Sequence, residues 1–120
     1  MKTGSRMSLT GRIVSLSFPF DDLHSVKTRP ALCLTEVLGI RRQVVVAFIT
    51  SQSDDPPMTT DIVLDPASAE FKQTGLKVLS ILRLHRLATV SDSIFRRNIG
   101  AIPETSYPEI RAKLRNLFKL

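Results

Sequence analysis

The order of apolar and polar residues predicts a chain built mostly from short β-strands. Residues 13–18 alternate apolar side chains with serines, which is typical of a strand with one buried face. Residues 31–34 form a short apolar strand, and residues 43–49 form a nearly continuous β-branched run that favours a strand covered on both faces. Gly39 lies between these two strands, so we expect residues 36–42 to be a hairpin connection.

Turn residues and short apolar runs continue through the middle of the chain. Residues 61–64 predict a short strand. Asp65 and Pro66 suit the cap and the first position of a short helical turn, which Gly75 would end. Three further strands are expected over residues 76–84, 87–90 and 96–100, the first two joined near His85 and Arg86 and the third at a sheet edge.

The end of the chain changes from strand spacing to helical spacing. One amphipathic helix is predicted, because apolar residues recur every three or four positions, at Tyr107, Ile110, Leu114 and Leu117. Ser106 is its expected N-cap, and Pro108 suits its first turn. The fold class is therefore mainly β (α+β): a small, strongly bent sheet or barrel of five to seven strands with a short helix and a C-terminal amphipathic helix.

Length and charge narrow the kind of protein. With 120 residues, the chain is expected to form a single domain over residues 11–120, preceded by a flexible N-terminus over residues 1–10. Seventeen Lys and Arg against eleven Asp and Glu give a net charge of +6. This excess is consistent with a polyanionic ligand, nucleic acid first, with an acidic protein partner, or with a basic protein that binds neither.

The composition also argues against several classes of protein. No apolar run approaches the roughly 20 residues of a membrane span, and the first residues lack the apolar core of a signal peptide. The single cysteine, Cys33, excludes an internal disulfide and a cysteine zinc cage, and its position between leucines predicts a small core residue. A cytoplasmic location fits these observations.

Two strand ends carry the most informative chemistry. Arg29 stands where a polar loop becomes a strand, and Thr50 and Ser51 follow the buried strand over residues 43–49. If the strands pair as an antiparallel hairpin, Arg29 and Thr50 become neighbours. Such a donor cluster suits a phosphate oxyanion. The alternatives are an arginine paired with a carboxylate and hydroxyls that only close a turn.

RNA is a ligand that can supply the nucleophile which this donor cluster lacks. The ribose hydroxyl can itself attack the adjacent phosphodiester, so the protein does not have to supply a nucleophile. It needs only to orient the reacting groups, stabilise the developing charge and transfer protons.

Three segments, in the same order, resemble the motifs of the MazF/PemK toxin family. The opening motif matches residues 11–14, 18–21 and 27–32, the second matches residues 44–51, and the third matches residues 75–80 with Arg83. The match extends over about residues 11–90, and the terminal helix is similar in kind.

This resemblance implies a compact, SH3-like barrel with helices, usually a homodimer. It implies a metal-independent endoribonuclease toxin, without a cofactor, that inhibits growth by cleaving single-stranded RNA such as mRNA at short sequences. Attack by the ribose 2′-hydroxyl would leave a cyclic phosphate and a free hydroxyl. A cognate acidic antitoxin would occupy the RNA groove, and operator DNA would be bound only through the antitoxin complex.

The resemblance also assigns roles to individual residues. Arg29 would stabilise the charge of the crowded phosphorane, and Thr50 would hydrogen-bond the scissile phosphate with Ser51 beside it. Three residues are candidate RNA contacts: Lys27, Gln52 and Arg83. For Lys27 the alternative is a solvated side chain, and for Arg83 it is a structural ion pair.

Proton transfer is the weakest part of the resemblance. Some members carry an aspartate and a nearby arginine in the third motif as a base and acid pair, but this chain has Ser80 and apolar residues there. Ser80 and His24 are the remaining candidates. His24 has a suitable ordinary pKa, with a solvent-facing loop histidine as the alternative, and His85 is expected at the surface.

Metal binding and two other functions complete the alternatives. Two pairs of adjacent aspartates, at residues 21–22 and 54–55, lie in turn-like sequence where solvated aspartates are common, so no metal site is expected. A non-catalytic member of the same fold would bind RNA or a protein without cleavage, which Ser80 at the acidic position favours. A toxin of related fold would inhibit DNA gyrase through its terminal helix.

Overall fold

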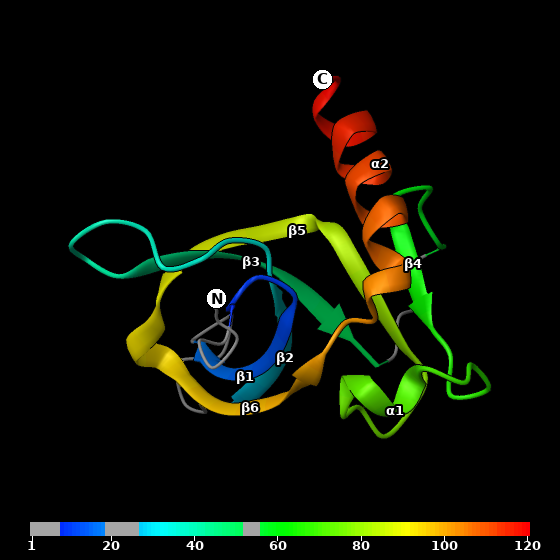
Figure 1. The fold of residues 1–120 in the computed structure, drawn as a ribbon, viewed down its shortest axis with the longest axis horizontal. Helices are drawn as coiled ribbons and strands as arrows, with labels where there is room; N and C mark the ends of the chain where they lie inside the picture. Colours follow the sequence, from blue (N-terminus) through cyan, green and yellow to red (C-terminus); the bar gives the residue numbers. More distant parts are fainter. Residues whose placement is uncertain (1–7, 19–26, 52–55) are drawn as a thin grey trace, which may run out of the picture.

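The computed structural model describes residues 8–18, 27–51 and 56–120 (Figure 1). Within these residues, six antiparallel strands form one sheet in the order β4-β5-β3-β2-β1-β6. The strands are β1 Arg12–Phe18, β2 Lys27–Cys33, β3 Gln43–Thr50, β4 Asp61–Leu64, β5 Ser80–Ser91 and β6 Phe95–Ala101. The helices are α1 Phe71–Thr74 and α2 Tyr107–Phe118, and the 3₁₀ turns are Asp92–Ile94 and Glu104–Ser106. The expected fold class is confirmed.

The sheet curls so strongly that side chains on both of its faces are buried (Figure 1). In β3, Val44 and Val46 are buried on one face, and Ala47 and Ile49 are buried on the other. The first face joins a core made of strand residues within the curl, and the second joins a core that α1 and α2 cover. The prediction that β3 is covered on both faces is confirmed.

Cys33 belongs to the core within the curl, as predicted. Burial, followed by the negative charge of Glu36, raises the pKa of its thiol to about 12. Because the thiolate is the nucleophilic form of cysteine, Cys33 is an inert packing residue at neutral pH.

β5 corrects the predicted strand pattern. It runs without a break from Ser80 to Ser91, so the predicted end of a strand near residues 85–86 is wrong, and residues 76–79 lie before the strand begins. The register explains the error, because residues 83–86 of β5 all stand opposite the single residue Phe48 of β3. Such a bulge bends a strand without ending it, and β3 is long enough to pair with both halves.

The predicted helix start at Asp65 is also wrong, whereas its predicted end is confirmed. The Asp65 carboxylate accepts a hydrogen bond from the Ala67 N–H at 2.9 Å, so it closes a local turn, and α1 begins only at Phe71. Gly75 ends α1 in the left-handed conformation, with φ +73°, and donates its N–H to the Lys72 carbonyl.

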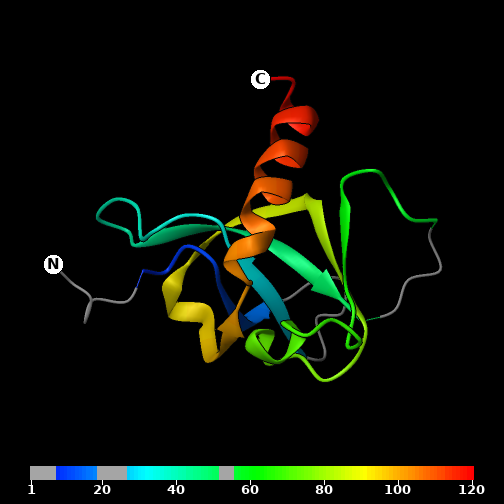
Figure 2. The same cartoon turned by 45° about the vertical axis from the view of Figure 1, so that its right-hand side comes forward.

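α2 is attached to the sheet at its beginning and extends beyond β4 and β5 (Figure 2). Ile110 is buried, and Tyr107 and Leu114 pack against the same core. Ser106 makes no capping hydrogen bond, because the preceding 3₁₀ turn runs directly into α2 and leaves Ser106 in a helical conformation. Pro108 occupies the first turn, as predicted. Among the described residues, no helix is long and apolar enough to cross a membrane.

Glu36 ties the start of the described chain to the hairpin between β2 and β3. Its carboxylate accepts hydrogen bonds from the Ser8 hydroxyl at 2.7 Å, the Leu9 N–H at 2.9 Å, and both the N–H and the hydroxyl of Thr10. These bonds, with the Thr10 hydroxyl first, lower the pKa of Glu36 to about 2. The described part of the expected N-terminal tail is therefore fixed to the barrel.

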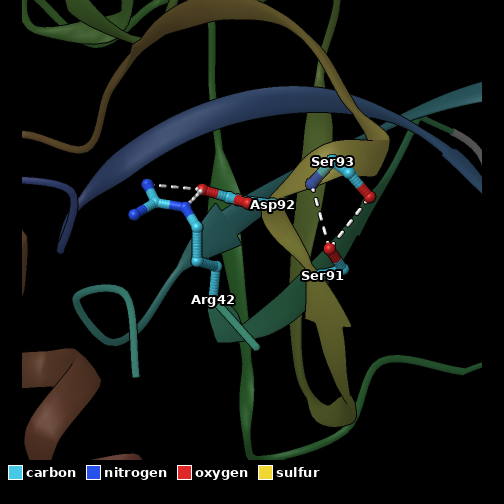
Figure 3. A network of polar contacts seen from close by, with 4 residues as sticks. All are labelled: Arg42, Ser91, Asp92 and Ser93. Atoms are coloured by element: carbon cyan, nitrogen blue, oxygen red, sulfur yellow. Dashed lines mark hydrogen bonds and ion pairs between the residues drawn. The ribbon is translucent and has the colours of Figure 1, made fainter. Parts of the chain in front are cut away.

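The tip of the same hairpin is held by Arg42 (Figure 3). Its Nε and Nη2 lie 2.9 and 2.8 Å from Oδ2 of Asp92, and its carbonyl accepts a hydrogen bond from the Asp92 N–H. The Ser91 hydroxyl accepts a hydrogen bond from the Ser93 N–H and so caps the 3₁₀ turn that contains Asp92. The hairpin is thus connected to the turn that joins β5 and β6.

Gly75→Ala should destabilise the fold more than Gly39→Ala. Both glycines have φ near +73°, but an added Cβ at Gly75 would meet the carbonyl of Ile99, whereas at Gly39 it would meet nothing within 4 Å. Gly39→Ala should cost about 1 kcal/mol through backbone strain alone, and Gly75→Ala clearly more. Urea unfolding measures both, and equal losses would contradict the close approach of α1 and β6.

Glu36→Gln should destabilise the protein in a pH-dependent way. Because the pKa of Glu36 is lowered from 4.5 to about 2 in the folded protein, its stabilisation is present above pH 4.5 and is lost as the pH falls through about 2. The wild type should exceed the variant by about 1 kcal/mol at pH 7, since the carboxylate is exposed. Urea unfolding between pH 2 and 7 tests this, and a constant difference would contradict it.

Candidate active site

The pairing of β2 with β3 brings Arg29 and Thr50 together. The strands place Ala31 opposite Phe48, and the same register carried two residues beyond that pair puts Arg29 opposite Thr50. Facing residues of antiparallel strands lie on the same side of a sheet, and both residues line one open pocket of about 500 Å³. The proximity expected from the hairpin is therefore observed.

Two further segments complete this pocket, which we call the cationic pocket. Its remaining lining residues are Pro30, Phe48, Ile49, Ser51, Leu76, Lys77, Val78, Ser80 and Arg86. Three of the lining residues are cations, namely Arg29, Lys77 and Arg86, and none of the described lining residues is a carboxylate. An excess of positive charge in a concave site attracts anions, and arginine suits phosphate oxygens in particular.

Thr50 offers a hydrogen bond to the pocket. Its Oγ1 is buried and has no hydrogen-bond partner among the described residues. Buried polar atoms normally have a partner, so a hydroxyl of this kind in the wall of a pocket is suited to a ligand. Ser51, the next residue, is exposed and lines the same pocket.

Ser80 differs from Thr50, although both line the cationic pocket. It is buried, with 2% of its surface exposed, and its hydroxyl donates a hydrogen bond to the Val78 carbonyl at 2.9 Å. This hydrogen bond gives the Ser80 hydroxyl a structural role, because it stabilises the turn that leads into β5. Among the described lining residues of the pocket, no histidine or carboxylate is present that would activate Ser80 as a base.

Arg83, a candidate RNA contact, is not among the lining residues of the pocket. Its side chain is 4% exposed, and its Nη1 lies 3.8 Å from Oδ2 of the buried Asp61. The placement agrees with the structural alternative raised by the sequence, so we omit Arg83 from the proposed RNA contacts.

Of the other candidate residues from the sequence, one is described by the structure and two are not. Lys27 is exposed on β2, two residues before Arg29 and on the same strand face, although it does not line the pocket. His24 and Gln52 lie outside the described residues.

Lys77 and Arg86 are pocket residues that the sequence reasoning did not identify. Lys77 lies within the third motif, where its charge was a usable signal. Arg86 carried no such signal, because only the bulge in β5 brings it to the pocket.

Metal ligands are not gathered in the described part of the chain. No group of three or more His, Cys, Asp or Glu side chains there could hold a metal ion. The aspartate pairs at residues 21–22 and 54–55 lie outside the described residues. The described groups of the site are thus hydrogen-bond donors and cations, which suit an anion.

A curled six-stranded sheet among the described residues, with cations and hydroxyls around a pocket at strand ends, defines a small β-barrel protein with a positively charged pocket. Residues 10–118 match the family described as the PemK-like, MazF-like toxin of type II toxin-antitoxin systems. The chain belongs to this family, and the resemblance found in its motifs is confirmed. No curated protein sequence matches the chain.

Solved structures with a similar fold include proteins from Mycobacterium and Deinococcus. The Mycobacterium tuberculosis toxin MazF-mt6 is 23% identical, with a TM-score of 0.64, over 89% of this chain and 97% of that one. A MazE–MazF complex from Deinococcus radiodurans is 22% identical, with a TM-score of 0.67, over 92% and 95%. A mycobacterial endoribonuclease in complex with its cognate antitoxin is 15% identical, with a TM-score of 0.66, over 95% and 97%.

Arg83→Met and Arg86→Met should separate structural arginines from pocket arginines. Arg83→Met leaves the buried Asp61 carboxylate without its ion-pair partner, which should cost roughly 3–5 kcal/mol of stability. Arg86 is exposed, so Arg86→Met should change stability by no more than about 0.5 kcal/mol. Urea unfolding of both variants provides the test, and similar losses would contradict the assignment.

Proposed function

We propose that the protein is an endoribonuclease toxin that cleaves single-stranded RNA at short sequences without a metal ion. The observation that carries this proposal is the convergence of Arg29 and Thr50 on the cationic pocket. Membership of the PemK-like and MazF-like toxin family supports it, as do relatives of the same fold that are described as endoribonucleases.

In the proposed reaction, the RNA supplies its own nucleophile. The ribose 2′-oxygen loses its proton and attacks the adjacent phosphorus, which becomes a five-coordinate phosphorane. The bond from phosphorus to the 5′-oxygen then breaks, and that oxygen gains a proton. The products are a 2′,3′-cyclic phosphate and a free 5′-hydroxyl.

The pocket residues have distinct roles in this reaction. The planar guanidinium of Arg29 stabilises the additional charge on the phosphorane oxygens. The Thr50 hydroxyl donates to a non-bridging oxygen of the scissile phosphate, with Ser51 as a second donor beside it. Lys77 and Arg86 hold the neighbouring phosphates and so orient the ribose for attack.

We assign proton transfer to His24, which takes the proton of the 2′-hydroxyl and returns it to the leaving 5′-oxygen. Neither histidine nor a carboxylate is present among the described lining residues, and the Ser80 hydroxyl is bonded to a backbone carbonyl. His24 has an ordinary pKa suited to a general base and precedes Arg29 by only five residues.

The partners follow from the same proposal. A cognate acidic antitoxin neutralises the toxin by covering the cationic pocket. The complexes of relatives with their antitoxins support a partner of this kind, and the positive charge of the pocket supports the place where it binds. We further propose a homodimer that acts in the cytoplasm and meets operator DNA only as part of the antitoxin complex.

A second candidate function is RNA binding without cleavage. The lack of a histidine or carboxylate among the described lining residues favours it. This reading predicts RNA that is bound but never shortened at any pH, whereas the ribonuclease reading predicts cut ends that carry a cyclic phosphate.

Arg29→Ala should lower RNA cleavage by at least about 100-fold, because it removes the stabilisation of the phosphorane charge. Purified protein is incubated with long single-stranded RNA in excess chelator, and the cut ends are mapped. Wild-type cleavage should persist in the chelator.

The matched control for this experiment is Lys27→Ala, which removes a cation two residues away on the same strand face. It should reduce cleavage only a few-fold and, like Arg29→Ala, leave thermal unfolding unchanged. Undiminished cleavage by Arg29→Ala would refute the assignment, and loss of wild-type cleavage in chelator would refute metal independence.

A further inference from the structure

A second cluster of ionisable side chains lies next to the cationic pocket, on the bulge of β5. The bulge consists of residues 83–86, which stand opposite Phe48 alone. Towards β3, these extra residues have no partners of their own, and towards β4 only Arg83 is paired, with Asp61. Side-chain contacts therefore contribute to the shape of this part of β5.

Asp61 makes those contacts from the neighbouring strand β4. Its side chain is 3% exposed, and it stands opposite Arg83 in the register. Oδ2 lies 3.8 Å from Nη1 of Arg83 and accepts a hydrogen bond from the Met58 N–H at 2.9 Å. Oδ1 lies 4.0 Å from Nδ1 of His85. One buried carboxylate thus lies within 4.0 Å of two side chains of the bulge, without a hydrogen bond to either, and His85 adds a charge only when it is protonated.

The burial of Asp61 limits the conformations that the bulge can adopt. A buried carboxylate requires compensating charge and hydrogen bonds, and a bulge that turned Arg83 away would leave Asp61 uncompensated. The carboxylate therefore favours the bulge geometry in which Arg83 faces it, and in that geometry His85 lies beside Arg83 at 4.0 Å from the carboxylate.

Arg86 follows His85 directly and lines the cationic pocket. Its side chain is exposed, and it has no hydrogen bond or ion pair with any other described residue. Its direction is consequently set by the backbone of the bulge and not by a bond of its own.

We infer that Asp61 is a positioning residue for the cationic pocket: through Arg83 and His85, it fixes the bulge that presents Arg86 to the phosphates of a bound single strand. The inference rests on the proposed function in taking single-stranded RNA as the ligand. Asp61 does not line the pocket, so it acts only through its neighbours.

The direction in which Asp61→Asn changes RNA affinity distinguishes this positioning role from an effect of net charge. Asp61→Asn raises the net charge of the protein by one, so charge alone predicts tighter binding of a polyanion. The positioning role predicts weaker binding, because Arg86 loses its defined position.

The test is a double-mutant cycle between Asp61→Asn and Arg86→Met. The probe is a fluorescent 2′-O-methyl oligoribonucleotide of mixed sequence, which lacks the nucleophilic hydroxyl and cannot be cleaved. Each single substitution should weaken binding by about 5-fold and reduce the salt dependence by about one phosphate contact, a slope change near 0.7. The double variant should bind within about 2-fold of Arg86→Met alone, since both changes remove the same contact.

Lys77→Met is the matched control, because Lys77 is a cation of the same pocket that lies outside the bulge. Its effect should multiply with that of Asp61→Asn. A general loss of stability would instead lower affinity equally in the Lys77→Met and Arg86→Met backgrounds. Multiplicative effects of Asp61→Asn and Arg86→Met, or tighter binding by Asp61→Asn, would overturn the inference.

A variant that fails to fold does not end the test. If thermal unfolding shows that Asp61→Asn is unfolded, His85→Asn takes its place in the same cycle, since the His85 side chain is 29% exposed. Independence of His85 and Arg86 in that cycle would also overturn the inference. Coupling without any RNA cleavage by the wild type would refute only the proposed function, and cleavage without coupling would refute only the positioning role.

Discussion

The architecture and the site both rest on the pairing of β3 with two neighbouring strands. Pairing with β2 places Arg29 and Thr50 in the lining of one pocket, and pairing with β5 brings the segment with Lys77 and Arg86 to the same pocket. The pairing also buries both faces of β3, because the curled sheet encloses one face and the helices cover the other. Stability and the site therefore depend on the same register.

Burial divides the arginines of this chain into two kinds. Arg83 is enclosed and lies against the buried Asp61, as the cost of an isolated buried charge requires. Arg86 is exposed at the edge of the barrel, where solvent stabilises its charge, and no carboxylate is present in the described lining of the pocket that it shares with Arg29. A basic net charge thus becomes a local excess at one pocket, which is what a phosphate backbone requires.

Much of the fold could be predicted from the sequence, because strand periodicity and turn chemistry are local. The strands at residues 13–18, 43–49 and 61–64, the hairpin through Gly39 and the helix end at Gly75 were all visible in this way. The errors fell where a distant partner decided the outcome. β5 continues through its bulge because β3 holds both halves, and Ser106 fails to cap α2 because a 3₁₀ turn precedes it.

The residue pattern alone predicted the mainly β fold, the two strand ends that carry Arg29 and Thr50, and the family motifs around them. Which other side chains meet at these strand ends depends on contacts between distant segments of the fold. In the structure, Arg83 lies outside the pocket, Lys77 and Arg86 line it, and the Ser80 hydroxyl donates a hydrogen bond to a carbonyl. The physical reason is that periodicity assigns a residue to a strand face, whereas a bulge and a buried carboxylate on another strand decide where that face points.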